Sequence, residues 1–222
     1  MLPIKATVVA TGQAGLDTCK DYVQSLGKPM NDIFIVCHPA GASYIKGMNV
    51  YGTEGAQKSI VSGSTGATTQ GLFAAFGVDF HGGNDTAAIT NTVNGKVQLA
   101  GIDFEVIDRG ESYDLAIPSM NVIYTHMLGK TTHSILTSAA HIEAFQQMLK
   151  EYQAAGYAMI LTSYGGLEGQ DAVAEKISYL NKTKEIMQQS KTADEFKAAM
   201  QAAFPAYDGL NYLDMSAGFL YK

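Results

Sequence analysis

An uninterrupted run of four β-forming residues, at positions 33–36, constrains the fold of this chain more than any other feature. Because its apolar residues do not alternate with polar ones, the run predicts a strand that is buried on both faces. The run ends at Cys37 and His38 and continues into a loop of small residues at 39–43. Ligands of open α/β sheets gather where strands end at their carboxyl edge. The sequence therefore predicts an α/β protein with a candidate site beside His38.

The composition limits the size class of the protein and its partners. Its 222 residues, 46% of them hydrophobic, can fill the core of one domain that spans residues 1–222. A net charge of −6 provides no basic field, so neither nucleic acid nor an acidic membrane surface is an expected partner. Cys19 and Cys37 are expected to be reduced thiols.

The N-terminal sequence bears on where the protein is found. It shows no signal-peptide pattern, and no apolar run in the chain reaches the ~20 residues that a membrane span needs. The protein is therefore expected to be cytoplasmic. A mature exported chain that begins at a new Met1 would carry the same pattern, so export stays open as an alternative.

The first third of the chain predicts strands joined by helices. Residues 6–10 indicate a short strand, 16–26 a helix with one apolar face, and 33–36 the next strand. A β-α-β order of this kind implies parallel neighbours and a right-handed crossover. A further strand is expected at 49–51, and one or two small helices within 52–77, a glycine-containing stretch that is also a candidate lid.

Residues 79–125 predict short antiparallel strands separated by turns. Asn94-Gly95 between two apolar runs is a strong hairpin signal, because both residues accept the backbone conformation of a tight turn. Two later turns are expected at 109–110 and 118–119. The expected strands cover residues 88–90, 96–99, 102–107, 114–117 and 121–124.

The last third of the chain predicts helices around one buried strand. A helix is expected over 138–155, where Ser138 can act as its cap, and Asp171 can cap a second helix that runs to about Ser190. The remaining expected elements are a strand at 158–161, a last helix at 193–203 that begins with the capping box of Thr192 and Glu195, and an apolar tail that packs back on the body.

The order of these elements resembles that of the metallo-β-lactamase superfamily. The strand at 158–161 and the Thr-Ser-Tyr-Gly-Gly loop at 162–166 are similar to the superfamily's strand that ends in a Gly-His-Gly loop. The helices that follow, with the Phe-Pro-Ala-Tyr segment at 204–207, are similar to the helical tail of many such hydrolases. The resemblance implies an αβ/βα four-layer sandwich with a metal site at one edge. The usual N-terminal β-hairpin has no counterpart in this sequence, so either the chain is trimmed at its N-terminus or the first sheet has an altered edge.

The first metal motif of the superfamily, His-x-His-x-Asp-His, follows its buried strand. The positions that match it here are His38, Ala40, Ala42 and Ser43. Alanine has no donor atom and serine is a poor zinc ligand, whereas a zinc site needs three or four well-placed ligands. The resemblance therefore implies a degenerate motif and the loss of the superfamily's dinuclear zinc site.

The later ligands of the superfamily also have altered counterparts in this chain. Its last histidine corresponds to Tyr164, and Glu111 is the nearest candidate for a middle histidine. His126 lies near the position of the bridging aspartate, on which paired-zinc hydrolysis depends. His133 follows seven residues later, and this spacing is not a local metal motif.

Three functions are compatible with the resemblance. The preferred one is a non-catalytic protein that binds an unknown small molecule or another subunit, without a cofactor, in a pocket lined by His38, Ser43, Glu111, His126 and Tyr164. The second is a metal-dependent hydrolase with a single zinc, iron or manganese ion held by His38, His126 and either Glu111 or His133. The third is a structural or oligomerisation protein, and the apolar tail makes a homodimer an expected assembly.

Overall fold

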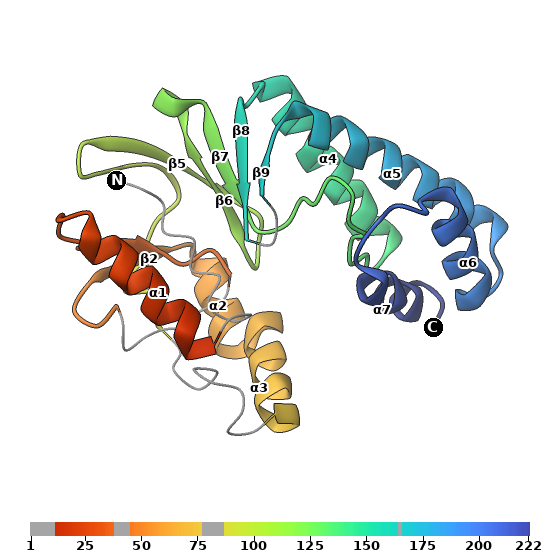
Figure 1. The fold of residues 1–222 in the computed structure, drawn as a ribbon, viewed down its shortest axis with the longest axis horizontal. Helices are drawn as coiled ribbons and strands as arrows, with labels where there is room; N and C mark the ends of the chain where they lie inside the picture. The colour runs from red at the N-terminus through yellow and green to blue at the C-terminus, as the bar shows by residue number, and fades with distance from the viewer. Residues whose placement is uncertain (1–11, 38–44, 77–86, 164–165) are drawn as a thin grey trace. The chain divides into compact units, whose positions relative to one another are not determined.

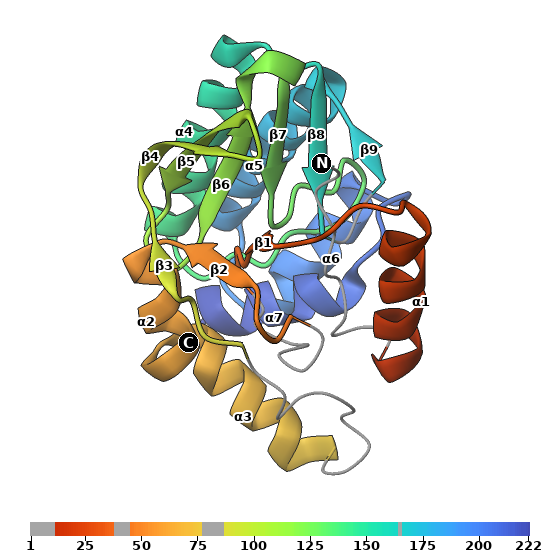
Figure 2. The same cartoon turned by 90° about the vertical axis from the view of Figure 1, so that its left-hand side faces the viewer.

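The computed structural model describes residues 12–37, 45–76, 87–163 and 166–222. The chain folds into two compact units, Met1–His126 and Met127–Lys222 (Figures 1 and 2). The expectation of one domain over residues 1–222 stays a prediction. The strand expected at 6–10 lies outside the described residues.

The first unit contains a parallel sheet in the order β1-β2-β3. Its described strands are β1 (Asp32–Phe34), β2 (Asn49–Gly52) and β3 (Asn91–Thr92). Beyond the end of β1, the Ile35 amide still donates to the Tyr51 carbonyl at 3.0 Å, and Ile35 and Val36 are buried. The run at 33–36 therefore forms the buried strand end that the sequence predicts.

The strand expected at 88–90 is displaced along the chain. The Val50 amide donates to the Thr90 hydroxyl at 3.0 Å instead of to a backbone carbonyl, while the Thr90 amide donates to the Val50 carbonyl at 2.9 Å. Because a side chain takes the place of the carbonyl in the ladder, regular pairing begins only at Asn91.

An antiparallel sheet follows in the same unit. Its strands are β4 (Gly95–Leu99), β5 (Ile102–Asp108), β6 (Tyr113–Ile117) and β7 (Val122–Thr125), and the 3-10 helix η2 (Pro118–Met120) joins the last two. Each strand pairs with the next along the chain. The antiparallel arrangement and the turns expected at 109–110 and 118–119 are confirmed.

The hairpin predicted at Asn94-Gly95 is wrong. Strand β3 before it pairs with β2, and β4 after it pairs with β5, so these residues cross from one sheet to the other. The tight hairpin lies at Ala100 and Gly101, whose φ angles are 51° and 78°. A two-residue type I′ turn requires positive φ at both positions, and here the strand pairing imposes that conformation on an alanine.

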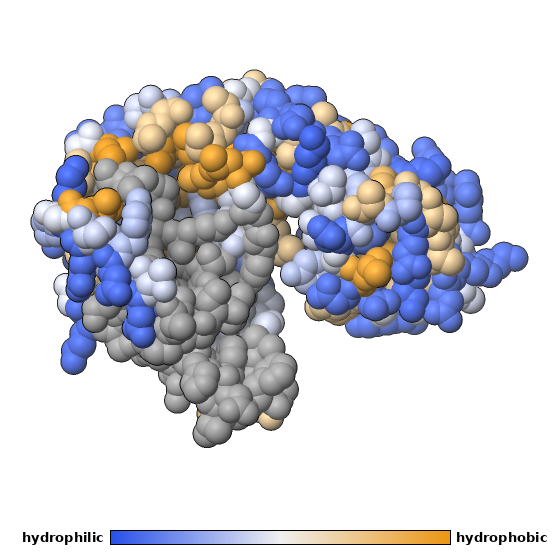
Figure 3. Space-filling view, viewed as in Figure 1, coloured by the Kyte–Doolittle hydropathy of each residue, from blue (hydrophilic) through white to orange (hydrophobic). Residues whose placement is uncertain are grey.

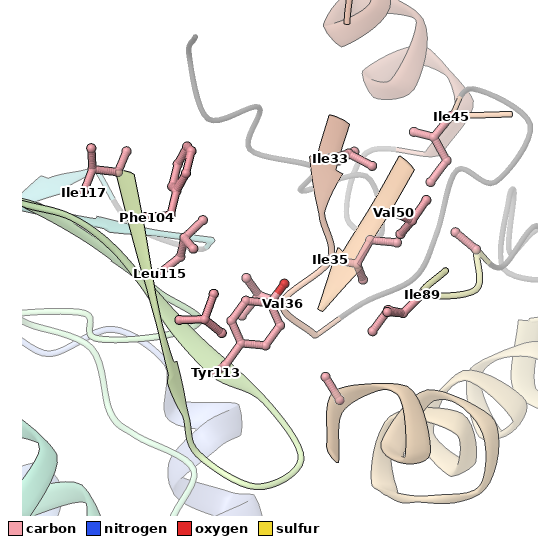
Figure 4. Packing of buried hydrophobic residues seen from close by; sticks show 13 residues of the cluster. Ile33, Ile35, Val36, Ile45, Val50, Ile89, Phe104, Tyr113, Leu115 and Ile117 are labelled. Atoms are coloured by element: carbon pink, nitrogen blue, oxygen red, sulfur yellow. The ribbon is translucent and has the colours of Figure 1, made fainter. Parts of the chain in front are cut away.

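The two sheets of the first unit share one hydrophobic core (Figure 4). Ile33 and Val50 contribute from the parallel sheet, and Phe104 and Leu115 from the antiparallel one. The Phe34 and Phe104 rings lie 5.2 Å apart, and the Tyr113 hydroxyl donates to the Tyr51 carbonyl at 3.2 Å. This sheet-on-sheet packing is the sandwich element that the fold prediction requires.

Three helices of the first unit are described: α1 (Gly12–Ser25), α2 (Glu54–Ser62) and α3 (Ser64–Phe76). The helix expected at 16–26 is confirmed, although it begins earlier. The two small helices expected within 52–77 are also confirmed. Thr53 caps α2 by accepting from the Ala56 amide at 3.1 Å.

The second unit is mainly helical. Its described elements are α4 (Ala139–Ala155), β8 (Met159–Thr162), β9 (Leu167–Glu168), α5 (Gln170–Gln189), α6 (Ala193–Ala203) and α7 (Leu210–Leu220). Ser138 and Thr192 cap their helices as predicted, and the apolar tail after α6 forms a further helix. The expected cap at Asp171 is wrong: α5 begins after Gly169, and Asp171 pairs with Lys130 at 2.7 Å.

Apolar side chains form a large part of the core of the second unit. Ile142, Leu149, Leu180 and Phe196 are buried between its elements. Hydrophilic side chains cover most of the visible face of α5 (Figure 3). Within the described residues, no helix has the length and apolar character to cross a membrane.

Candidate functional site

The structure describes only some of the predicted site residues. His38, Ser43 and Tyr164 lie outside the described residues. Glu111 is exposed in the turn between β5 and β6. His126 follows β7 directly and is half-buried, with contacts of its own. Two of the five proposed lining residues can therefore be located, and both belong to the first unit.

Glu111 belongs to a group that we name the hydroxyl–carboxylate cluster, formed by Ser59, Ser64, Thr65 and Glu111. The Ser64 hydroxyl donates to the Glu111 carboxylate, and the Ser59 hydroxyl lies 3.3 Å from the same oxygen. Ser59 also lies 3.0 Å from the Thr65 hydroxyl and accepts from the Thr65 amide. Ser59 and Thr65 are buried, whereas Ser64 and Glu111 are exposed. The cluster thus leads from the interior to the surface.

The junction between α2 and α3 brings these side chains together. Gly63 ends α2, where its amide donates to the carbonyls of Lys58 and Ser59, and α3 begins at the next residue. A Cβ atom at Gly63 would lie 2.6 Å from Ser59 Cα and 3.2 Å from a Glu111 oxygen. Any side chain here would therefore push the helix junction away from Glu111.

Cys37 joins this cluster to the end of β1. Its Sγ lies 3.9 Å from the Thr65 hydroxyl. Burial raises the pKa of the Cys37 thiol, the hydrogen bond from Thr65 opposes that rise, and the Glu111 charge adds to it. Because His38 follows Cys37 in the chain, the cluster lies at the strand end where the sequence predicts a site.

Sequence reasoning missed the three hydroxyl residues of this cluster. The stretch Ser59 to Thr65 carries serine and threonine on both sides of Gly63, but its composition alone indicates only small residues between helices. Their role depends on Glu111, which lies in the β5–β6 connection at least 46 residues later in the chain. Nothing local in the sequence signals that approach.

The described residues do not supply a metal centre. No group of three or more His, Cys, Asp or Glu side chains among them is arranged to hold an ion. Both Ser59 and Ser64 face the Glu111 carboxylate with hydroxyl groups. What the cluster offers chemically is a carboxylate acceptor beside hydroxyl groups that can donate or accept.

His133, the third metal candidate, lies in the second unit. Its side chain is 1% exposed, and its Nδ1 lies 3.2 Å from the Tyr179 hydroxyl. Burial and the nearby Lys176 charge lower the pKa of His133. Aromatic rings of Tyr179, Phe204 and Tyr207 lie against the imidazole.

Comparison with known proteins finds a match in structure but not in sequence. No protein-family profile matches the chain, and no curated protein sequence does. Among solved structures, the metallo-beta-lactamase family protein TTHA1429 from Thermus thermophilus is 14% identical, with a TM-score of 0.59 over 92% of this chain and 79% of that one.

A second similar structure is that of a larger protein. The stereoselective inverting sec-alkylsulfatase Pisa1 from Pseudomonas sp. is 13% identical, with a TM-score of 0.54. The similarity covers 93% of this chain but only 43% of the sulfatase. Identities this low establish a shared fold and nothing about shared chemistry.

Proposed function

Because this chain has the metallo-β-lactamase fold, we propose that it is a non-catalytic protein of that fold that binds a small polar molecule beside the hydroxyl–carboxylate cluster. The α/β fold class predicted from the sequence is confirmed. The fold by itself hosts different chemistries, so the proposal depends on the side chains of the site.

The residues of the degenerate motif support a site without paired metals. Ala40 and Ala42 stand where the superfamily has two ligands, and an alanine side chain has no donor atom. Ser43 stands at a third ligand position. With one histidine left of the motif's four ligands, the chain is not equipped for the two-metal chemistry of its fold.

The observation that carries the proposal is the arrangement of Glu111. The resemblance to the superfamily makes this carboxylate the nearest candidate for the position of a metal-ligating histidine, and hydroxyl groups of Ser59 and Ser64 face it. The exposed carboxylate and the oxygen of the exposed hydroxyl beside it can each accept a hydrogen bond from a ligand. A ligand with adjacent N–H or O–H donors, such as a polyol or an amine, has the chemistry that this pair would recognise.

Native mass spectrometry of the full chain, purified under mild conditions, tests the proposal. We expect a bound small molecule on part of the wild-type protein and its loss in Glu111→Gln. The matched control is Glu105→Gln, since Glu105 lies on β5 in the same unit but outside the cluster. An adduct that persists in Glu111→Gln, or a wild type that carries none and gains none from glycerol, sorbitol or spermidine, overturns the proposal.

A mononuclear hydrolase is the second candidate, and the position of Glu111 favours keeping it. The Glu111 charge acts on Cys37, which precedes the proposed ligand His38 in the chain. His126 lies in the same unit. A single bound zinc, iron or manganese ion would supply Lewis-acid chemistry at that position.

Metal analysis separates the two candidates. The protein is purified without a histidine tag and without added metal, beside His38→Ala and His126→Ala, with His141→Ala from α4 as the control. About one metal ion per chain, lost in the first two variants and retained in the control, establishes the hydrolase candidate. We expect no stoichiometric metal and no zinc uptake on titration.

A cytoplasmic location and a homodimer remain predictions beside this proposal.

A further inference from the structure

The second unit contains a group of polar side chains that are buried except for the half-buried Tyr207, and we name it the buried polar cluster: His133, Lys176, Tyr179 and Tyr207. Lys176 is 0% exposed and donates from Nζ to the Thr132 carbonyl at 2.6 Å. The same ammonium lies 4.6 Å from the centre of the Tyr179 ring and 5.8 Å from that of Tyr207. These two rings are stacked, with centres 5.4 Å apart.

The hydrogen bonds of this cluster bear on which nitrogen of His133 carries the proton. The Tyr179 hydroxyl accepts from the Ser134 amide at 3.4 Å and lies 3.2 Å from His133 Nδ1, a pair in which the direction of donation depends on the tautomer of the imidazole. With the Tyr179 hydroxyl as the donor in this pair, Nδ1 is unprotonated and the neutral ring carries its proton on Nε2. His133 Nε2 is buried and has no hydrogen-bond partner among the described residues.

Lys176 adds a charge to this unpaired donor. In the part of the chain that the structure describes, no carboxylate lies within ion-pair distance of Lys176. Glu168 and Glu175 act on it only from farther away. Glu168 accepts instead from the Gly129 and Lys130 amides, and Glu175 accepts from the Tyr207 hydroxyl at 2.6 Å. A buried ammonium without an ion-pair partner and a buried imidazole nitrogen without a hydrogen-bond partner are both costly.

We propose that the buried polar cluster binds a small oxyanion, a carboxylate or phosphate group, between His133 Nε2 and the Lys176 ammonium. An anionic oxygen would accept from both groups and remove both costs at once. Charge-assisted hydrogen bonds of this kind are stronger than neutral ones. The proposal is independent of the function assigned to the hydroxyl–carboxylate cluster, because every residue it uses belongs to the second unit.

The aromatic residues around the cluster indicate how an anion could enter. Tyr179 and His133 are buried, whereas Phe204 and Tyr207 are half-buried and follow the end of α6. The Phe204 ring lies 4.9 Å from Tyr179 and 4.8 Å from Tyr207. An anion would therefore approach the cluster past these two half-buried rings.

Thermal unfolding of the full chain tests the site with inorganic phosphate and with acetate, at ionic strength held constant with sodium chloride. A ligand that binds only the folded state raises the Tm as its concentration rises. We expect such a rise for at least one of the two anions, and the more effective anion identifies phosphate or carboxylate as the preferred group. We expect the affinity to fall about tenfold to a hundredfold in Lys176→Met and in His133→Gln.

Lys182→Met is the matched control, since Lys182 lies on the same helix and pairs with Glu185 at the surface. It removes the same charge and should leave the anion effect unchanged. A wild-type Tm that neither anion raises, or a rise that is equal in Lys176→Met and Lys182→Met, overturns the proposal.

A measurement on the wild type avoids dependence on variants that fold poorly. Nitrogen NMR of the histidine side chains reports the protonation of Nδ1 and Nε2 separately. We expect His133 to be neutral with the proton on Nε2, and its Nε2 signal to shift as phosphate or acetate is added. A ring protonated on Nδ1, or an Nε2 signal that neither anion moves, contradicts the proposal.

Discussion

The two polar clusters of this molecule have opposite hydrogen-bond balances. In the hydroxyl–carboxylate cluster, a charged acceptor at the surface has hydroxyl donors beside it. In the buried polar cluster, the Lys176 ammonium donates to the Thr132 carbonyl but has no ion-pair partner among the described residues, and His133 Nε2 has no hydrogen-bond partner there. The first cluster suits a ligand with donors, and the second an anion. In each cluster, the ligand that we propose supplies the complementary hydrogen-bonding groups: donors for the first cluster and acceptor oxygens for the second.

The largest expected effect comes from breaking the packing of the buried polar cluster. Tyr179 is 1% exposed and contacts His133, Phe204 and Tyr207. Tyr179→Ala should lower the free energy of unfolding by about 4 kcal/mol, since it leaves a cavity the size of an aromatic ring. Tyr179→Phe keeps the ring and should cost only about 1 kcal/mol. Urea denaturation measures both, and equal losses would show that the hydroxyl dominates.

The pH dependence of stability probes the charge of Lys176. Burial lowers the pKa of Lys176 from 10.5 to about 8. Between these values the unfolded chain holds a proton that the folded chain has released, so stability rises with pH. Burial also raises the pKa of Tyr179 to about 12, which makes stability fall above about pH 10.

The Lys176 contribution is isolated by comparing the wild type with Lys176→Met. From pH 8 to 10 the unfolding free energy of the wild type should gain on the order of 2 kcal/mol relative to the variant. Urea unfolding at each pH gives the difference. A flat difference across this range means that the lysine stays charged in the folded protein.

Removing hydroxyl groups from the hydroxyl–carboxylate cluster should lower the free energy of unfolding by a smaller amount. Ser59 is 1% exposed and has polar neighbours in Thr65 and Glu111, so Ser59→Ala should lower the unfolding free energy by about 1 kcal/mol. Ser64 is exposed, and Ser64→Ala should change it by less than about 0.5 kcal/mol. Denaturation of both variants ranks the buried and exposed contacts. A larger loss in Ser64→Ala would reverse the assignment of interior and surface.

The smallest expected effect concerns the Cys37 thiol. The Glu111 charge contributes to the raised pKa of Cys37, so Glu111→Gln should lower this pKa. In a Cys19→Ser background, alkylation by iodoacetamide at pH 8 should then be about twofold faster. Glu105→Gln should leave the rate unchanged. A slower reaction in Glu111→Gln would mean that the variant buries the thiol further.

Much of the fold follows from local patterns in the sequence. The caps at Ser138 and Thr192, the apolar face of α4 and the short strands of the antiparallel sheet are each specified by residues within one turn or one strand. The exceptions have non-local causes. Asn94-Gly95 has hairpin chemistry, yet the pairing of β3 with β2 makes it a crossover, and Ala100 adopts a positive φ because β4 and β5 pair on either side of it.

Some features of the candidate site can likewise be identified from the sequence, whereas others depend on contacts between distant residues. The strand end beside Cys37 and the altered motif at Ala40, Ala42 and Ser43 can be identified from the sequence, because donor atoms are a property of the residue type. Glu111 could be named as a candidate but not given its hydroxyl partners. His133 is a metal candidate by residue type, and the structure places a lysine in its surroundings instead of a set of ligands.

Residue types and their local order are sufficient for the α/β class, most of the element boundaries and the lack of donors at two positions of the metal motif. These depend on hydrophobic period, capping chemistry and side-chain composition, all of which are local. Tertiary packing, by contrast, determines which hydroxyls meet Glu111, and that Lys176 is buried beside His133. Such contacts join residues that are more than 40 positions apart in the chain. His133 and Lys176, for example, are separated by 43 positions. Burial and partner choice arise from packing, and the sequence period of a single element does not encode them.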